Sequence, residues 1–303
     1  MRRTASSFLR MSQLRAMRMG SVRVRAAGQR GGRAAGQQEG SVPQLALISS
    51  DDMPSTPPRV PASPLPVLDS RSRGTRFIQL TVRSVLNTPA ATKMGFWSIN
   101  PYVGCEFGCT YCYARDTHRW VVERLGSGAT QGSDLPHRPA APLPPWEAFE
   151  KEILIKSDVA EVLRRTLNPS RIAGHSLVIG TATDPYQPAE RSFQLTRSIL
   201  EVLRSYHGLS IEIITKSPLI VRDLGLLQIL SQHNEVSINI SLATADRRLA
   251  RRLELRSPVP EARLRALRRL TAGGIYAGLI VAPIVPGITD DWAGLARLME
   301  AAK

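Results

Sequence analysis

Short apolar segments alternate with amphipathic segments from about residue 95 to the end of the chain. This alternation constrains the fold more than any other feature of the sequence. The apolar segments are rich in β-branched residues, as expected of strands that are covered on both faces of a sheet. We predict five such strands, at residues 96–104, 176–183, 209–215, 235–243 and 275–285.

Amphipathic helices are predicted between these strands, at residues 193–206, 218–230 and 260–272. In the first of them, one apolar stripe consists of Leu195, Ile199, Leu203 and Tyr206. Alternation of strands and helices predicts a parallel sheet with right-handed crossovers. A Gly- and Pro-rich stretch at 126–146 is predicted to be an excursion loop. The chain ends at Lys303 after a predicted fifth helix, where such a sheet has room for another strand, as in a truncated sequence.

Residues 1–70 are predicted to form a disordered, basic and Pro-rich arm, separate from a folded domain at 71–303. Residues 1–40 contain nine Arg, no Lys and one acid, so they carry +8 of the net charge of +15. Their first 38 residues are free of acid, which also fits an organellar transit peptide. With no uninterrupted apolar run of membrane-spanning length, we expect a cytoplasmic protein without a membrane partner.

The chain has only three cysteines, Cys105, Cys109 and Cys112, and all of them lie within eight residues. An odd number of clustered thiols fits metal binding in a reducing compartment better than a disulfide framework. They follow a predicted strand and precede a predicted helix, so they lie on the face where parallel α/β folds bind ligands. Gly104 and Gly108 allow the backbone to wrap closely around a bulky group.

Thiolates are the preferred ligands of iron–sulfur clusters, and a 4Fe–4S cluster takes four ligands. Three cysteines leave one iron open, and an open coordination site is typical of a catalytic metal. A different interpretation uses His118, which would complete a Cys3His zinc site in an RNA-binding protein with a basic tail. Zinc modules of that kind are small and loop-rich, whereas these cysteines open a long series of strands and helices.

The string NPYVGCEFGCTYCYAR at 100–115 resembles a known signature. C-x3-C-x2-C with an aromatic residue before the last cysteine, here Tyr111, is typical of radical S-adenosylmethionine enzymes. The longer string looks like the spore photoproduct lyase-like branch, whose members are often labelled DNA repair photolyases. This resemblance extends from about Thr75 to the C-terminus. The fold that we expect is α/β, a partial open (β/α) barrel of five to six parallel strands.

The resemblance implies that the amine and carboxylate of S-adenosylmethionine chelate the open iron. An electron from the cluster then cleaves the sulfonium and yields a 5′-deoxyadenosyl radical. The stretch 180–190 is where the superfamily contacts the amine, and its polar candidates are Thr183, Asp184 and Glu190. A turn with a helix N-cap explains the same stretch, because Asp-Pro and Gln-Pro both interrupt regular structure.

Lys216 follows the third strand, where the family places a lysine that pairs with the methionyl carboxylate. Ser241, near the end of the fourth strand, is a similar candidate, although a serine there also caps turns. The stretch 282–290 resembles the pattern G-x-I-x-G-x-x-E beside the adenine. Its four places hold Pro283, Val285, Gly287 and Asp290, and only Gly287 matches.

The expected activity is reductive cleavage of S-adenosylmethionine, with electrons from a donor such as flavodoxin or ferredoxin. The family label alone suggests a nucleic-acid substrate, and a member that binds a cluster without turnover is a further alternative. In the spore photoproduct lyase mechanism an additional cysteine donates hydrogen, and this chain has no fourth cysteine. A tyrosine such as Tyr113 or Tyr186 is the alternative donor. A basic helical stripe of Arg247, Arg248, Arg251 and Arg252 fits either phosphate contacts or a solvated face.

Overall fold

The computed structural model describes residues 67–70, 74–118, 121 and 143–303, and all structural statements concern these residues. The predicted arm at 1–70 and the predicted loop at 126–146 therefore lie mostly outside the described residues. Two short parts of them are described: Val67–Ser70 forms a strand, and a helix begins at Pro145. In the described part, no helix combines the length and the apolar character needed to cross a bilayer.

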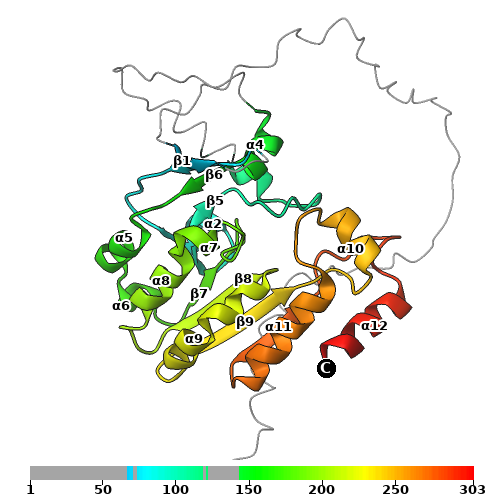
Figure 1. Cartoon of the computed structure of the whole chain (residues 1–303). Coiled ribbons are helices and arrows are strands. Elements are labelled where there is room, and N and C mark those ends of the chain that lie inside the picture. Colours follow the sequence, from blue (N-terminus) through cyan, green and yellow to red (C-terminus); the bar gives the residue numbers. More distant parts are fainter. Residues whose placement is uncertain (1–66, 71–73, 119–120, 122–142) are drawn as a thin grey trace, which may run out of the picture. The chain divides into compact units, whose positions relative to one another are not determined.

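A mainly parallel six-stranded sheet forms the centre of the fold (Figure 1). Its strands are, in spatial order, β10 (Tyr276–Ile280), β9 (Glu235–Ser241), β8 (Ser210–Thr215), β7 (Ser176–Ile179), β4 (Trp97–Ile99) and β3 (Leu86–Asn87). All neighbours are parallel except β3 and β4, so β3 is the one antiparallel strand of this sheet. The five parallel strands follow one another in chain order, which confirms the predicted alternation.

Helices cover one face of this sheet, and Figure 1 shows α8, α9 and α11 side by side across it. The helical elements are α2 (Pro89–Thr92), α4 (Pro145–Lys151), α5 (Val159–Thr166), α6 (Pro169–Ile172), α7 (Glu190–Phe193), α8 (Leu195–Leu203), the 3-10 helix η2 (Pro218–Asp223), α9 (Leu224–Ser231), α10 (Arg247–Leu253), α11 (Pro260–Ala272) and α12 (Trp292–Ala302). The apolar stripe predicted for 193–206 is buried at Leu195, Ile199 and Leu203, and it packs in the main core against the sheet. The predicted helix at 218–230 begins as a 3-10 helix, with Pro218 at its first position and Ser217 as its N-cap.

Burial alternates along β8 and β9, so one face of these strands is fully buried and the other only partly, whereas the sequence predicted cover on both faces. Ile211, Ile213 and Ile238 face the main core and are at most 1% exposed. The opposite face is only partly buried and carries polar groups, including Asn239, whose amide donates to Glu212 at 2.5 Å. A continuous apolar run would seal both faces, whereas this sheet keeps one face available for polar contacts.

The predicted strand at 96–104 is two strands in different sheets. Residues 97–99 form β4, and Tyr102–Val103 forms β5 in a second, four-stranded sheet. The order of this second sheet is β1 (Val67–Ser70), β2 (Arg76–Gln79), β6 (Glu152–Ile155) and β5. The break lies at Pro101, which lacks a backbone N–H and so cannot continue the hydrogen-bonded ladder.

A buried lysine supports this break. Lys156, 9% exposed, follows β6 and donates from Nζ to the Asn100 carbonyl at 2.6 Å. The Asn100 side chain in turn accepts from the Ala182 amide at 2.8 Å. Burial lowers the pKa of Lys156 to about 8.

Because of this shift, the free energy of unfolding should depend on pH above 8. Between about pH 8 and 10 the folded chain has released the Lys156 proton while the unfolded chain keeps it, so unfolding becomes less favourable as the pH rises. We expect Lys156→Met to remove this contribution. In urea denaturation, the stability of the wild-type chain relative to Lys156→Met should rise from pH 7 to pH 10. A constant difference would show that Lys156 keeps an ordinary pKa in the folded chain.

Candidate active site

The three cysteines lie in one loop that follows β5 of the four-stranded sheet. It leaves β5 at Val103, and the Cys105 amide is anchored by the Phe149 carbonyl at 2.8 Å. Cys105 and Cys109 are buried, Cys112 is partly buried, and all three are free thiols. They pack in a small apolar cluster with Phe107, Ala114 and Phe149. The loop is therefore a compact part of the structure that presents three sulfur atoms at the end of the fold where β7, β8 and β9 terminate.

Two glycines allow the loop to take this path. Gly104 has φ +92°, and a Cβ atom there would lie 2.8 Å from the Phe149 carbonyl oxygen. Gly108 has φ +64°, and its Cβ would lie 2.6 Å from the Arg256 guanidinium. Both positions combine a left-handed backbone with close neighbours, which only glycine accommodates without strain.

Burial raises the pKa of all three thiols. For Cys105, the nearby Asp184 and Cys109 raise it further. For Cys109 burial raises the pKa to about 11, although Lys216 acts in the opposite direction. For Cys112 Arg115 acts against burial. Three sulfur donors on one loop form a ligand set of the kind that binds the irons of a cluster.

The segment 253–257, after α10, lies antiparallel against the cysteine loop. The Thr110 amide donates to the Leu253 carbonyl at 2.9 Å, and the Arg256 amide donates to the Phe107 carbonyl at 2.9 Å. Between them, Glu254 pairs with Cys109 in an isolated β-bridge. A segment that lies about 150 positions further along the chain therefore forms one wall of the loop.

A polar cluster joins the ends of β8 and β9 to this wall. Lys216, directly after β8, donates from Nζ to Ser241 Oγ at 2.8 Å and to Tyr111 Oη at 3.1 Å. Its Nζ also lies 2.9 Å from Glu254 Oε1, and the Tyr111 hydroxyl donates to the same carboxylate oxygen. The second oxygen of Glu254 pairs with Arg263, which is 1% exposed. Three of the expected residues, Tyr111, Lys216 and Ser241, thus meet at one point.

Glu254 and Arg263 were not expected from the sequence. Glu254 is a single acid at the end of a basic helix, a pattern typical of a solvated surface. Arg263 interrupts the apolar face of α11, and buried arginines are rare. Only the tertiary contact between the two residues shows their place in the cluster.

Thr183 and Asp184 lie beside the cysteine loop. Thr183 Oγ1 donates to the Gly104 carbonyl at 2.6 Å. Asp184 accepts from Thr215 Oγ1 and from the Lys216 amide, both at 2.7 Å, which fixes the end of β8. Burial raises the pKa of Asp184, whereas these donors act in the opposite direction. Both residues therefore connect the loop to the strand ends.

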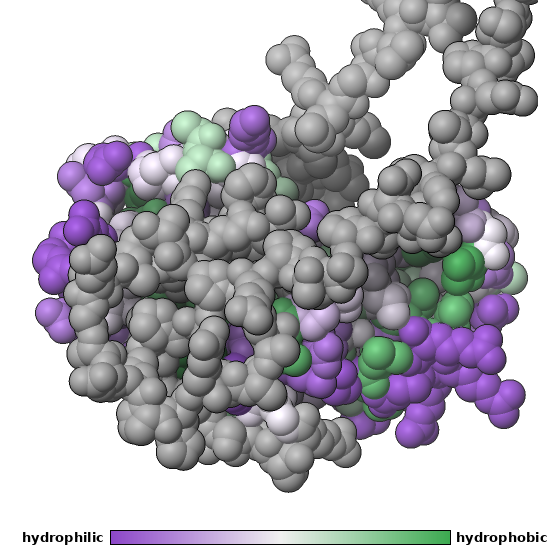
Figure 2. All heavy atoms as spheres, turned by 90° about the horizontal axis from the view of Figure 1, so that it is seen from above, coloured by the Kyte–Doolittle hydropathy of each residue, from purple (hydrophilic) through white to green (hydrophobic). Residues whose placement is uncertain are grey.

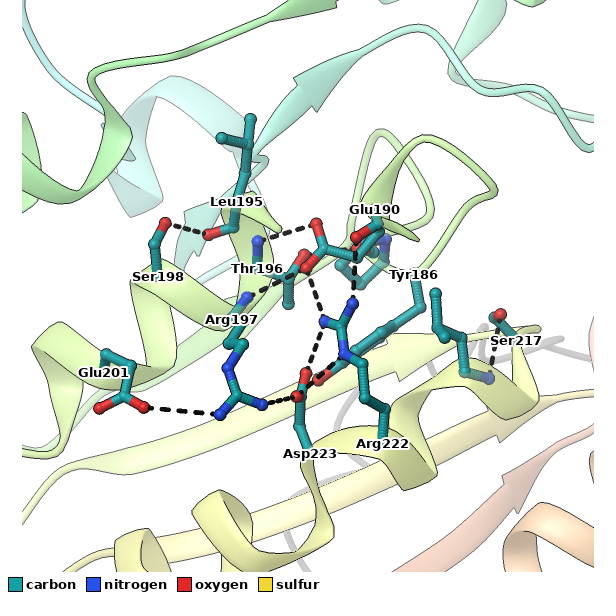
Figure 3. Close-up of polar contacts among 12 residues, drawn as sticks. Tyr186, Glu190, Leu195, Thr196, Arg197, Ser198, Glu201, Ser217, Arg222 and Asp223 are labelled. Atoms are coloured by element: carbon teal, nitrogen blue, oxygen red, sulfur yellow. Dashed lines mark hydrogen bonds and ion pairs between the residues drawn. The ribbon is translucent and has the colours of Figure 1, made fainter. Parts of the chain in front are cut away.

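Glu190 belongs to a different cluster (Figure 3). It is fully buried, accepts from the Thr196 amide at 3.0 Å, and pairs with Arg222 at 3.0 Å. Arg222 also pairs with Asp223 at 2.8 Å. Glu190 thus opens α7, accepts from amides in the first turn of α8 and pairs with η2, which agrees with the interpretation of this stretch as a turn with a capped helix. The structure does not bring it to the cluster around Lys216.

The remaining candidates are spread over three places. Tyr113 lies on the cysteine loop, is 64% exposed and donates from its hydroxyl to the Thr181 carbonyl. Tyr186 is fully buried, with Arg222 6.0 Å above its ring, and belongs to the cluster in Figure 3. Gly287 lies in an exposed turn after β10, where its amide donates to Asp290 Oδ1 at 2.8 Å.

Residues 99–299 match the radical SAM superfamily. The chain belongs to this superfamily. It is 32% identical over 228 residues to an uncharacterized protein of Mycobacterium tuberculosis, and the aligned segment covers 75% of this chain and 61% of that protein. It is 28% identical over 214 residues to an uncharacterized protein of Methanocaldococcus jannaschii, and that aligned segment covers 71% of this chain and 70% of the relative.

Solved structures of spore photoproduct lyase share the fold of this radical SAM protein. One, complexed with dinucleoside spore photoproduct, has a TM-score of 0.50 at 17% identity and covers 73% of this chain. A mutant with bound AdoMet and the same dinucleoside has a TM-score of 0.51 at 16% identity and covers 75% of this chain. The matches span 56% and 58% of those chains, so this chain matches somewhat more than half of their length.

The geometry around His118 does not support a Cys3His zinc site in this radical SAM chain. His118 is 1% exposed, its Nε2 lies 3.1 Å from the Glu152 carbonyl, and its ring packs edge-on against Phe149. In the described ranges, no three His, Cys, Asp or Glu side chains are grouped around a point where one ion could bind. A four-iron cluster needs no such point, because each thiolate binds a different iron.

Gly104→Ala should disturb the cysteine loop more than a matched substitution at Gly208. Both glycines have positive φ, but a Cβ at Gly208 meets nothing within 4 Å. Each substitution should cost about 1–2 kcal/mol for the left-handed backbone, and only Gly104→Ala adds a clash with a backbone oxygen. We therefore expect faster alkylation of Cys105 and Cys109 in metal-free Gly104→Ala than in Gly208→Ala, together with a larger loss of stability in urea. Equal alkylation rates would argue against close packing at Gly104.

Proposed function

We propose that this chain is a radical S-adenosylmethionine enzyme in which Cys105, Cys109 and Cys112 hold three irons of a 4Fe–4S cluster. The observation that carries the proposal is the position of Lys216. Its ammonium lies beside Tyr111, which is itself part of the cysteine loop, at the ends of β8 and β9. The thiols and a cation suited to a carboxylate are thus neighbours on the ligand-binding face of a parallel sheet.

When bound, the cluster would supply the electron that cleaves S-adenosylmethionine, received from a carrier such as flavodoxin or ferredoxin. The chain's own residues would bind and orient the cofactor. Lys216 would pair with its carboxylate, since charge-assisted hydrogen bonds are the stronger class. Tyr111 and Ser241 hold the Lys216 ammonium in place, and Thr183 and Asp184 hold the loop against the strand ends.

We also infer that the six-stranded sheet forms a partial open barrel. The parallel strands follow chain order and the helices lie on one face, which is the winding of a (β/α) barrel. The partly buried polar face of β8 and β9 would then line the interior, where Glu212 and Asn239 lie. Residues 71–303 would form this domain, the strand Val67–Ser70 would add to it by pairing with β2, and the residues before that strand would form a separate arm.

The proposal is tested by anaerobic reconstitution with iron and sulfide. We expect about four irons per chain, a brown protein, and formation of 5′-deoxyadenosine from S-adenosylmethionine after reduction. Iron without any 5′-deoxyadenosine would favour a non-catalytic member of the superfamily. Stoichiometric zinc with little iron would favour the Cys3His interpretation instead.

Lys216→Ala is the matching variant. It should keep its iron and bind S-adenosylmethionine at least about tenfold more weakly, because loss of a partner from a buried charge pair costs about 2–5 kcal/mol. Binding is measured by calorimetry, and thermal unfolding checks that the variant remains folded. An unchanged affinity for S-adenosylmethionine would show that Lys216 does not bind the cofactor.

A phosphate-bearing substrate, such as a nucleic acid, is supported by the surface of α10. Arg247, Arg248, Arg251 and Arg252 are exposed, and none of them pairs with a carboxylate of the described residues. Figure 2 shows a broad hydrophilic area, interrupted by apolar side chains, on the side of the molecule that carries α10 in Figure 1. Because α10 leads directly into the wall of the cysteine loop, a polyanion bound there would lie close to the thiols.

The double substitution Arg248→Ala/Arg252→Ala should weaken binding of a single-stranded oligonucleotide and reduce its salt dependence. Each lost phosphate contact lowers the slope of log K against log salt by about 1. The control, Arg164→Ala/Arg165→Ala, removes the same charge from exposed positions of α5. Equal effects of the two pairs would indicate only a response to net charge. Binding is measured by fluorescence anisotropy at several salt concentrations.

A further inference from the structure

Glu254 has an unusual environment for a carboxylate. It is 2% exposed, and its two oxygens contact three side chains from three different parts of the chain. Oε1 lies 2.9 Å from Lys216 Nζ and accepts from the Tyr111 hydroxyl, and Oε2 pairs with Arg263. Both oxygens of the carboxylate therefore have partners, and two of these partners are cations.

The backbone of Glu254 is held as firmly as its side chain. The residue follows α10 and pairs with Cys109 in a β-bridge, while Ser257 Oγ lies 3.7 Å from Cys109 Sγ. Arg256 donates to the Glu106 carbonyl at 2.6 Å and pairs with Glu150, and Arg115 pairs with Glu150 as well. Glu254 thus moves only if the cysteine loop moves.

The position of Glu254 affects Lys216, because Glu254 is one of the groups that hold the Lys216 ammonium. A lysine ammonium has three N–H groups, and the three acceptors around Lys216 are Glu254, Ser241 and Tyr111. A ligand carboxylate would take the place of one of the two neutral hydroxyls, while the ion pair with Glu254 continues to hold the ammonium. A lysine has a long flexible stem, so fixing it costs conformational entropy. When contacts within the protein already fix the lysine side chain, binding of a ligand does not have to restrict it further, and the affinity for the ligand is higher.

We infer that Glu254 is a positioning residue that couples the cysteine loop to Lys216. Its carboxylate holds the Lys216 ammonium and the Tyr111 hydroxyl at fixed places relative to Cys109, and Arg263 compensates its charge. This inference rests on the proposed function, because it assigns to Lys216 the carboxylate of S-adenosylmethionine. Beyond that function, the inference says that the affinity for S-adenosylmethionine depends on Glu254, although Glu254 does not itself contact the cofactor.

The test compares Glu254→Gln, Glu254→Asp and a matched control, Asp223→Asn. Glu254→Gln keeps the shape and removes the charge, and Glu254→Asp keeps the charge on a shorter side chain. Asp223 is also a buried carboxylate, 1% exposed and bound by two arginines, Arg197 and Arg222, in the separate cluster of Figure 3. It controls for the general effect of removing a buried charge.

The first measurement uses the metal-free protein, so it does not depend on the proposed function. We expect an amine-reactive acetylating reagent to modify Lys216 about tenfold faster in Glu254→Gln than in the wild-type chain, which corresponds to about 1.4 kcal/mol. Mass spectrometry of the peptide that contains Lys216 gives the rate. Asp223→Asn should leave this rate unchanged, and Glu254→Asp should fall between the two.

The second measurement uses the reconstituted protein and S-adenosylmethionine. Glu254→Gln should keep its iron, raise the Kd about tenfold and change the rate of 5′-deoxyadenosine formation at saturation much less. Partial recovery of affinity in Glu254→Asp supports the inference and excludes a merely structural role.

Unchanged Lys216 acetylation in Glu254→Gln, or an equal effect of Asp223→Asn, would overturn the inference. If Glu254→Gln does not fold, the comparison of Glu254→Asp with Asp223→Asn decides by the same rates. A wild-type chain that binds no S-adenosylmethionine would instead refute the proposed function, while the acetylation rates would still decide whether Glu254 positions Lys216.

Discussion

The ion pair between Lys216 and Glu254 joins parts of the chain that are far apart in sequence. Lys216 ends β8, Glu254 follows α10, and the Tyr111 hydroxyl between them belongs to the cysteine loop. A buried pair of this kind persists only if each charge is well bonded, because desolvation of both is costly. Arg263 supplies a further partner for Glu254, and Ser241 supplies one for Lys216.

The cysteine loop depends on the same arrangement. Its thiols are buried, which opposes their ionisation, and its backbone is held on one side by Phe149 and on the other by the segment 253–257. The loop backbone therefore has partners on both sides. Such support from neighbouring segments keeps the ligands of a binding site in place.

Several features of the fold were predicted correctly, and others were wrong for identifiable reasons. The five parallel strands were found because each forms a short β-branched run between amphipathic helices. The run at 96–104 was wrongly taken as one strand, although Pro101 marks its break, because hydropathy alone does not show a change of sheet. The expectation that both faces are covered holds only in part for β8 and β9, because the face that carries Glu212 and Asn239 is partly buried.

The sequence by itself determined where the five parallel strands of the main sheet lie, where the cysteines lie relative to them, and that Lys216 and Ser241 lie at the ends of neighbouring strands. These features follow from local periodicity and from the common edge at which parallel strands end. Only the tertiary structure decided that Glu254 and Arg263 complete the cluster and that Glu190 belongs elsewhere. Whether a charged residue is solvated or paired depends on contacts between distant segments, and periodicity contains no information about those contacts.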